Sequence, residues 1–134
     1  MNAKEEYIFT TKDPLDRIVV LKKSTLEDHI SGRHDEKSTN DIKANIKNPK
    51  YIIKDTKEHL NGNERNIYLD LTTSKDNDGN LKFRTMKTVV EFKEEITEDG
   101  TCIFGEVVTN YIMRKCSDSS NEGGLLYERS TDSI

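Results

Sequence analysis

The pattern of the chain changes from helix to strand in Ser38-Thr-Asn-Asp-Ile-Lys-Ala-Asn-Ile-Lys-Asn-Pro-Lys-Tyr-Ile-Ile-Lys54. Residues 38–41 have the form of a capping box, whose side chains satisfy backbone amides at the start of a helix. Ile42 and Ile46 lie about one helical turn apart and would form the buried stripe of this helix. Because proline disfavours helical backbone in the residue before it, Pro49 predicts the end of the helix. We therefore expect a helix that passes directly into a strand.

The residues before this stretch predict one strand and one further helix. Residues 17–21, Arg-Ile-Val-Val-Leu, form a β-branched apolar run that is typical of a strand. Ser-Thr-Leu-Glu at 24–27 is another capping box, so a helix is expected from about residue 25 to Gly32 or Arg33. Residues 1–16 are mostly polar and are expected to form an N-terminal extension.

The residues after Pro49 predict an antiparallel sheet, with strands over 51–54, 66–71, 81–93 and 101–114. Turn sequences containing Asn-Gly or Asp-Gly separate these runs. Residues 116–134 are expected to be a disordered acidic tail. The prediction is an α+β domain over 17–115, in which an N-terminal strand and two helices pack on a curled antiparallel sheet of about four strands.

Composition limits the function classes. With 134 residues, of which 32% are hydrophobic, the chain fits one domain with a small core. No apolar run approaches the roughly 18 residues of a membrane span, so no membrane partner is expected. Cys102 and Cys116 have neither disulfide-framework nor zinc spacing, which makes a reducing cytoplasm the simplest location.

Two of the three histidines lie in His29-Ile-Ser-Gly-Arg33-His34. A histidine can move a proton near neutral pH, and an arginine is a permanent, planar clamp for phosphate. This combination suits phosphodiester cleavage without a metal, while the alternative is an ordinary polar helix end. The spacing of the two histidines is poor for a zinc site, so neither a metal nor another cofactor is expected.

The segments Ile18-Val-Val-Leu21, His29-Ile-x-x-Arg33-His34 and Ile42 to Tyr51 together resemble the phage barnase–EndoU–colicin–RelE-like (BECR-fold) nuclease families. Members are small α+β domains of phage and bacterial toxin systems, and their last strand usually ends in a Thr/Ser-x-aromatic motif. Thr109-Asn-Tyr111 matches that motif, so the resemblance covers residues 17–113. Asp35 departs from the pattern, since a proline often follows the second histidine. A carboxylate there could orient His34 or repel a phosphate.

The resemblance implies metal-independent RNA cleavage, in which the 2′-hydroxyl attacks the adjacent phosphorus. His34 would be the acid or base and Arg33 the phosphate clamp. His29 is either a further member of the site or a packed helix residue. Thr109 and Tyr111 would bind a phosphate oxygen and stack a base, or else form an ordinary cross-strand pair.

Basic residues elsewhere are candidates for binding RNA phosphates. Lys82 and Arg84 share one strand face by the two-residue period, although charges also blunt exposed strand edges. Lys43 and Lys47 begin a basic run that either contacts phosphates or is a solvated face.

Two readings of function follow. The first is a metal-independent endoribonuclease of toxin type, with RNA as its substrate and a cognate inhibitor as a possible partner. The alternative is a non-catalytic phage or mobile-element protein that binds and inhibits a host protein, or an acidic immunity or antitoxin protein. The net charge of -4 suits the alternative.

Overall fold

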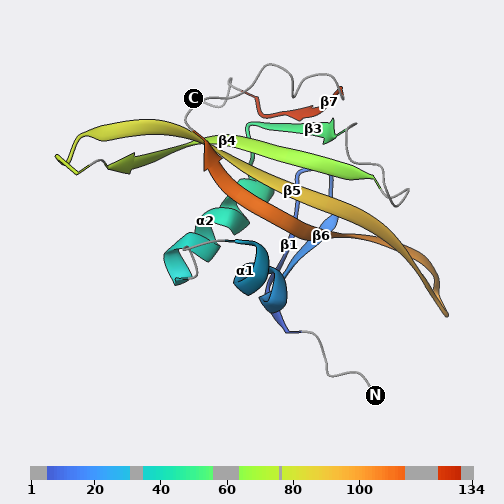
Figure 1. The fold of residues 1–134 in the computed structure, drawn as a ribbon. Helices are drawn as coiled ribbons and strands as arrows, with labels where there is room; N and C mark the ends of the chain where they lie inside the picture. Colours follow the sequence, from blue (N-terminus) through green and yellow to red (C-terminus); the bar gives the residue numbers. More distant parts are fainter. Residues whose placement is uncertain (1–5, 31–34, 56–63, 76, 114–123, 131–134) are drawn as a thin grey trace.

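The computed structural model describes residues 6–30, 35–55, 64–75, 77–113 and 124–130. Over these residues the fold is α+β, as predicted, with two helices on one face of a seven-stranded sheet (Figure 1). The sheet therefore has more strands than the four expected. In chain order the elements are β1 (Tyr7–Lys12), β2 (Ile18–Lys22), α1 (Lys23–His29), α2 (Glu36–Lys47), β3 (Tyr51–Asp55), β4 (Arg65–Lys75), β5 (Leu81–Thr97), β6 (Gly100–Met113) and β7 (Leu125–Glu128).

The strands lie in the order β1-β2-β6-β5-β4-β3-β7. β3 to β6 form an antiparallel meander, and the predicted antiparallel pairing of the two long strands, β5 and β6, is confirmed. β2 pairs with β6 in parallel, from Ile18 opposite Phe104 to Val20 opposite Glu106. Parallel neighbours need a long connection, and here the two helices and strands β3 to β5 separate β2 from β6 in the chain.

β1 corrects the prediction of an N-terminal extension, because it pairs with β2 along the edge of the sheet. Its inward positions, Phe9 and Thr11, are buried, whereas Thr10 and Lys12 are exposed. The sequence pattern missed this strand because a threonine occupies one of its two buried positions. A buried hydroxyl does not give the apolar alternation from which a strand is predicted.

A buried polar network holds the β1–β2 hairpin against the meander. Asp13 Oδ2 accepts hydrogen bonds from Tyr68 Oη at 2.6 Å and from Arg17 Nε at 2.9 Å. Arg17 also donates to Asn66 Oδ1 at 2.8 Å, and its guanidinium lies 4.1 Å from the centre of the Phe92 ring. Burial, followed by the bond to Asp13, raises the pKa of Tyr68, so the phenol remains a neutral donor.

β7 pairs with the outer edge of β3 and lies in the segment for which the sequence predicts a disordered tail. Tyr127 is half-buried and packs against the main core. A strand of four residues is too short to show a clear two-residue alternation, which explains why the pattern did not reveal it. Gly124, with φ of 90°, precedes the strand in a conformation that favours glycine.

The helices are capped differently from the prediction. α1 begins at Lys23, and its N-cap residue, Lys22, makes no side-chain cap hydrogen bond. It ends earlier than expected, because Ile30 has extended backbone angles. At α2, Asp35 is the N-cap and accepts from Ser38 N at 2.8 Å, so Ser38 lies inside the helix. None of the described helices is long and apolar enough to cross a membrane.

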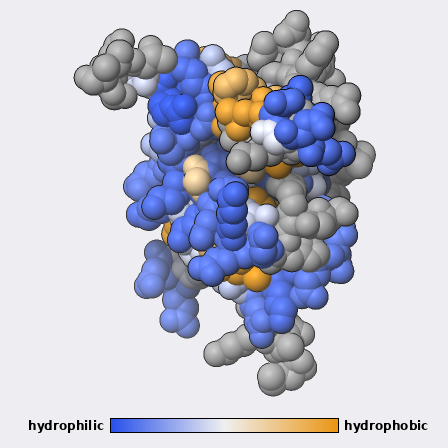
Figure 2. Space-filling model, turned by 90° about the vertical axis from the view of Figure 1, so that its left-hand side faces the viewer, coloured by the Kyte–Doolittle hydropathy of each residue, from blue (hydrophilic) through white to orange (hydrophobic). Residues whose placement is uncertain are grey.

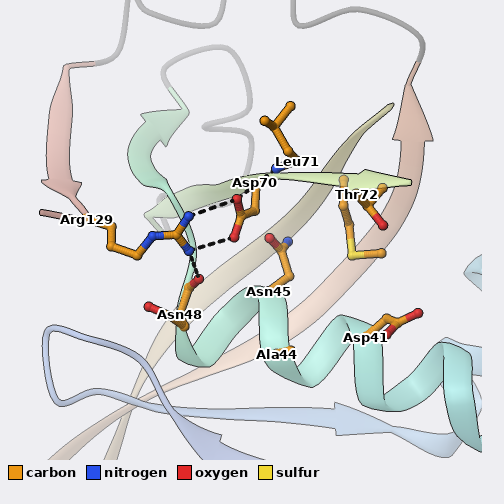
Figure 3. Close-up of a pocket in the computed structure, with 9 residues that line it drawn as sticks. Asp41, Ala44, Asn45, Asn48, Asp70, Leu71, Thr72 and Arg129 are labelled. Carbon is orange, nitrogen blue, oxygen red and sulfur yellow. Dashed lines mark hydrogen bonds and ion pairs between the residues drawn. The ribbon is translucent and has the colours of Figure 1, made fainter. Parts of the chain in front are cut away.

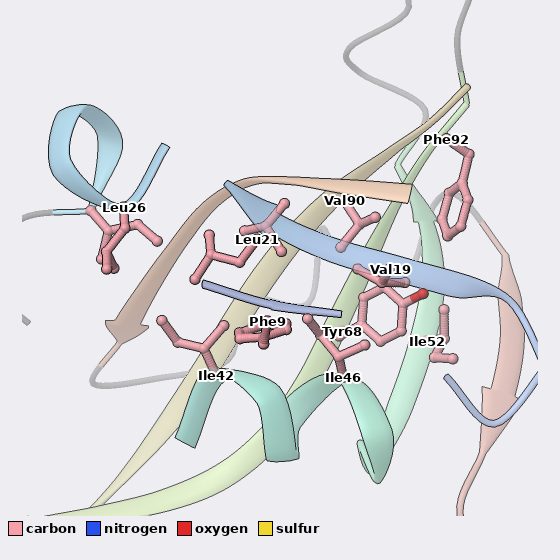
Figure 4. Packing of buried hydrophobic residues seen from close by; sticks show 12 residues of the cluster. Phe9, Val19, Leu21, Leu26, Ile42, Ile46, Ile52, Tyr68, Val90 and Phe92 are labelled. Atoms are coloured by element: carbon pink, nitrogen blue, oxygen red, sulfur yellow. The ribbon is translucent and has the colours of Figure 1, made fainter. Parts of the chain in front are cut away.

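The main core lies between the helices and the sheet (Figure 4). Ile42 and Ile46 of α2 are fully buried, as their spacing predicts. Gly105 allows the strands to pack closely, because a Cβ at this position would lie 2.5 Å from a Val90 side-chain carbon. The core consists of Phe9, Val19, Leu21, Leu26, Ile30, Ile42, Ile46, Ile52, Tyr68, Val90, Phe92 and Val107.

Candidate functional site

The end of α1 meets the last long strand. The hydroxyl of Thr109 on β6 donates a hydrogen bond of 3.3 Å to the backbone carbonyl of His29, the last residue of α1. The side chain of His29 is exposed. The structure thus brings together two of the predicted site residues, which lie 80 positions apart in the sequence.

A β-bulge contributes to the position of Thr109. Val90 pairs with Val107, whereas Val89 pairs with Thr109, so Val108 is an extra residue on β6. Such a bulge bends a strand and changes the direction of its side chains. The pairing of β2 with β6 ends at Glu106, and α1, which follows β2, contacts β6. This arrangement explains how a strand hydroxyl reaches the end of a helix.

Arg33 and His34 lie outside the described residues, so their predicted roles stay predictions. Their neighbour Asp35 has a structural role, because its carboxylate caps α2. The hydrogen bonds from Ser38 hold the pKa of Asp35 below its ordinary value of 3.8. The carboxylate of Asp35 is therefore engaged with the helix.

Tyr111 lies further along β6, and its side chain is 40% exposed. Lys87 is its cross-strand neighbour on β5, and the Lys87 ammonium lies 5.4 Å from the centre of the Tyr111 ring. An exposed ring beside a cation can stack a base while the cation contacts a phosphate. Lys87 adds a basic group to this part of the strand.

The other basic candidates fall into two separate groups. Lys82 and Arg84 lie on the part of the β4–β5 hairpin that extends beyond α2 (Figure 1). This part, residues 71–75 and 81–85, is here called the arm. By strand alternation Lys82 and Arg84 share a face with Met86, which lies opposite Asp70. On α2, the 100° rotation per residue places Lys43 and Lys47 on the flank away from Asp41.

The arm differs in character on its two faces. Leu71, Leu81 and Phe83 are exposed and lie on the face opposite Lys82 and Arg84. Figure 2 views the molecule from the side to which the arm projects, and most of the coloured surface is hydrophilic around a smaller hydrophobic area.

A buried polar cluster connects α2 with the strand that carries Thr109. The Thr88 hydroxyl oxygen accepts from Asn45 Nδ2 at 2.6 Å and from Asn110 Nδ2 at 2.8 Å. Asn45 Nδ2 also donates to the Tyr68 carbonyl at 3.1 Å. Asn45 was not predicted from the sequence, although one signal of its burial was present. It is a polar residue directly beside Ile46 on the apolar stripe of α2, where a buried amide is unusual.

A pocket of about 220 Å³ lies between α2, the start of the arm and the residue after β7 (Figure 3). Arg129 donates to both carboxylate oxygens of Asp70, at 2.9 and 3.4 Å, and to the Asn48 carbonyl at 2.8 Å. The sequence prediction placed Arg129 in a disordered tail, so it did not indicate this ion pair. The pocket is lined by Asp41, Ala44, Asn45, Asn48, Asp70, Leu71, Thr72, Met86 and Arg129.

The amino-acid sequence matches no family model and no curated protein, and the structure matches no solved structure. Across the described ranges, no group of three or more His, Cys, Asp or Glu side chains is arranged to hold a metal ion.

Proposed function

We propose that this chain is a small, metal-independent endoribonuclease of toxin type, as its resemblance to the BECR-fold nucleases implies. The observation that carries the proposal is the hydrogen bond from Thr109 Oγ1 to the His29 carbonyl. It supports the proposal because it joins the helix end of the His-Ile-x-x-Arg-His motif to the strand of the Thr-x-aromatic motif. A fold in which these motifs lay apart would contradict it.

In the proposed reaction, a base removes the proton of the RNA 2′-hydroxyl, and that oxygen attacks the adjacent phosphorus. The bond to the 5′-oxygen breaks, and an acid protonates the leaving oxygen. His34 takes one of these proton transfers, and Arg33 binds the non-bridging oxygens, where negative charge develops. The products are a 2′,3′-cyclic phosphate and a 5′-hydroxyl end.

The roles of the described residues follow from their contacts. The Thr109 hydroxyl already donates a hydrogen bond to the backbone carbonyl of His29, so we assign Thr109 to positioning the end of α1. Tyr111 is exposed beside Lys87 and is assigned to stacking a base next to a bound phosphate.

The direct test is incubation of the purified protein with total RNA in EDTA, alongside His34→Ala and Arg33→Ala. We expect the wild type to leave 2′,3′-cyclic phosphate ends and to spare DNA, which lacks the attacking hydroxyl. Loss of a general acid or base lowers the rate about 10²–10⁴-fold. His59→Ala is the matched control, since His59 lies outside the nuclease-like motifs, and its rate should equal that of the wild type.

A second candidate function is supported by the exposed carboxylates of the β5–β6 hairpin, Glu94, Glu95, Glu98 and Asp99. An acidic projection suits a protein that binds a basic surface of a host protein without catalysis. The same experiment separates the two. RNA left intact by the wild-type protein, together with partner binding that survives Arg33→Ala and His34→Ala, would favour the binding function.

A further inference from the structure

We propose that the pocket between α2 and the arm binds one RNA base that carries an exocyclic amino group: adenine, cytosine or guanine in preference to uracil. The identity of the ligand as RNA rests on the proposed function. The preference among bases rests on the polar groups of the pocket itself.

The first observation is a buried acceptor without a donor. Asn45 lines the pocket and is 4% exposed, and its Oδ1 has no hydrogen-bond partner. Exchanging the amide oxygen and nitrogen would not resolve this, because the nitrogen must face the Tyr68 carbonyl, which can only accept. Figure 3 shows the Asn45 amide pointing from α2 toward Asp70 across the pocket. A buried acceptor of this kind favours a ligand that brings an N–H group.

The second observation is that hydrogen-bond acceptors without a donor are present around the Asn45 amide. Asp41 and Asp70 both line the pocket. The charge of Asp70 is balanced by Arg129, whereas the Asp41 side chain has no ion pair or hydrogen bond within the described part of the chain. An exocyclic amino group offers two N–H donors to such a site. Uracil offers one N–H between two carbonyl oxygens, which would face carboxylates and bind poorly.

Size and surroundings agree with a single base. About 220 Å³ is below the range of roughly 300–1,000 Å³ for pockets that take drug-sized ligands, so the pocket suits one ring system. Met86 contributes a thioether to the wall, which is favourable beside an aromatic ring. Arg84 lies opposite Thr72 on the same face of the arm, next to the pocket. One nitrogen of its guanidinium donates to the Phe83 carbonyl at 3.1 Å, and the remaining N–H groups can donate to the phosphate of a bound nucleotide.

Hydrogen bonds link the pocket to the strand that carries Thr109. Asn45 and Asn110 share the Thr88 hydroxyl, and Asn110 is the neighbour of Thr109 on β6. A base bound at Asn45 therefore lies one buried hydrogen-bonded cluster away from the end of α1.

The test is titration of the full-length protein with AMP, CMP, GMP and UMP, followed by NMR of the Asn45 side-chain amide. Mononucleotides contain no internal phosphodiester bond, so binding is measured without cleavage. We expect at least one amino-bearing nucleotide to shift the Asn45 signal and to bind about tenfold or more tightly than UMP. Asp41→Ala should remove most of this preference. Asn40→Ala is the matched control, because Asn40 is exposed on the same helix.

Asn45 itself is a poor test position, because its substitution breaks buried bonds to Tyr68 and Thr88 and would unfold this region. Equal affinity for UMP, no shift of the Asn45 signal with any nucleotide, or an unchanged preference in Asp41→Ala would each overturn the inference. The outcomes remain separate from those of the cleavage test. Nucleotide binding with intact RNA would contradict only the enzyme, and RNA cleavage without nucleotide binding would contradict only the pocket.

Discussion

At the scale of single residues, Thr109 and Asn45 show how polar side chains organise this fold around the proposed site. Thr109 uses its hydroxyl to hold the end of α1, and Asn45 uses its amide to tie α2 to β4 and β5. Both contacts join segments that are distant in the sequence. Each residue thereby acts on the geometry of a neighbouring element.

The role of Thr109 predicts different effects for two substitutions. Thr109→Val keeps the shape of the side chain but removes the donor to the His29 carbonyl, whereas Thr109→Ser keeps the donor. A typical hydrogen bond contributes about 0.5–1.5 kcal/mol. We therefore expect the RNA cleavage rate of Thr109→Val to fall about threefold to tenfold and that of Thr109→Ser to stay near wild type.

The readout is the single-turnover rate at saturating RNA, with thermal melting measured on the same samples. Equal losses in the valine and serine variants would show that the hydroxyl does not position α1. Equal melting temperatures with a difference in rate would support the positioning role.

The sequence could indicate the junction residues but not the cluster or the pocket. His29, Thr109 and Tyr111 were found because they belong to motifs of the nuclease resemblance. Asn45 and Arg129 were missed because their roles depend on partners in other elements, Tyr68 and Asp70, which no local pattern reveals. Arg33 and His34 lie outside the described residues, and their assignment rests on the motif alone.

At the scale of elements, α2 is fixed at both ends by short polar signals. Asp35 caps its start, and the Asn48 amide nitrogen donates to the Ala44 carbonyl at its end. The capping-box pattern at residue 38 began the predicted helix too late, because an aspartate three positions earlier is an equally good cap. The predicted end before Pro49 is confirmed.

The cap predicts a dependence of stability on pH. The folded-state pKa of Asp35 is lowered, so its stabilising contribution is present above its unfolded-state pKa and is lost as the pH falls through the lower folded value. We expect Asp35→Ala to have a lower free energy of unfolding than wild type at pH 7, with the difference shrinking below about pH 4.

Urea unfolding between pH 2 and 7 measures this difference (conditions chosen to bracket the titration). Asp35→Asn is the control, since asparagine also caps helices but does not titrate. The Asp35→Asn variant should therefore remain more stable than Asp35→Ala at low pH. A constant gap between wild type and Asp35→Ala across the range would contradict the assignment.

The strands divide into those that local sequence predicts and those that it does not. The meander from β3 to β6 was predicted because turn sequences separate runs of apolar and β-branched residues. β1 and β7 were missed because they are short and lack a clear apolar alternation, and each is stabilised by pairing along an edge of the sheet. The parallel contact of β2 with β6 joins distant segments, so no local signal reports it.

At the scale of the whole molecule, β7 joins the C-terminal part of the chain to the core. Its Tyr127 packs on the core, and the following Arg129 completes the wall of the pocket. The Arg129 backbone N–H donates to the Lys50 carbonyl, and the Lys50 ammonium donates to the Arg129 carbonyl. Lys50 directly precedes β3. The segment therefore supports both the outer edge of the sheet and the proposed base site.

Tyr127→Ala tests this structural role. Removing a half-buried aromatic side chain should lower the free energy of unfolding by about 1–2 kcal/mol. Tyr7→Ala is the matched control, because Tyr7 lies on the opposite edge strand and is 52% exposed, so its effect should stay within about 0.5 kcal/mol. Chemical denaturation measures both. A Tyr127→Ala protein as stable as wild type would show that β7 is not part of the cooperative fold.

The parallel contact between β2 and β6 has a consequence for the newly made protein. As the chain leaves the ribosome, the β1–β2 hairpin emerges well before its partner residues 104–106, with both helices and strands β3 to β5 between them. The hydrogen bond from Thr109 to the His29 carbonyl needs a residue that emerges after residues 104–106. A nascent chain that lacks the last long strand therefore cannot assemble this junction. Any activity that depends on it begins only after Thr109 has left the ribosome.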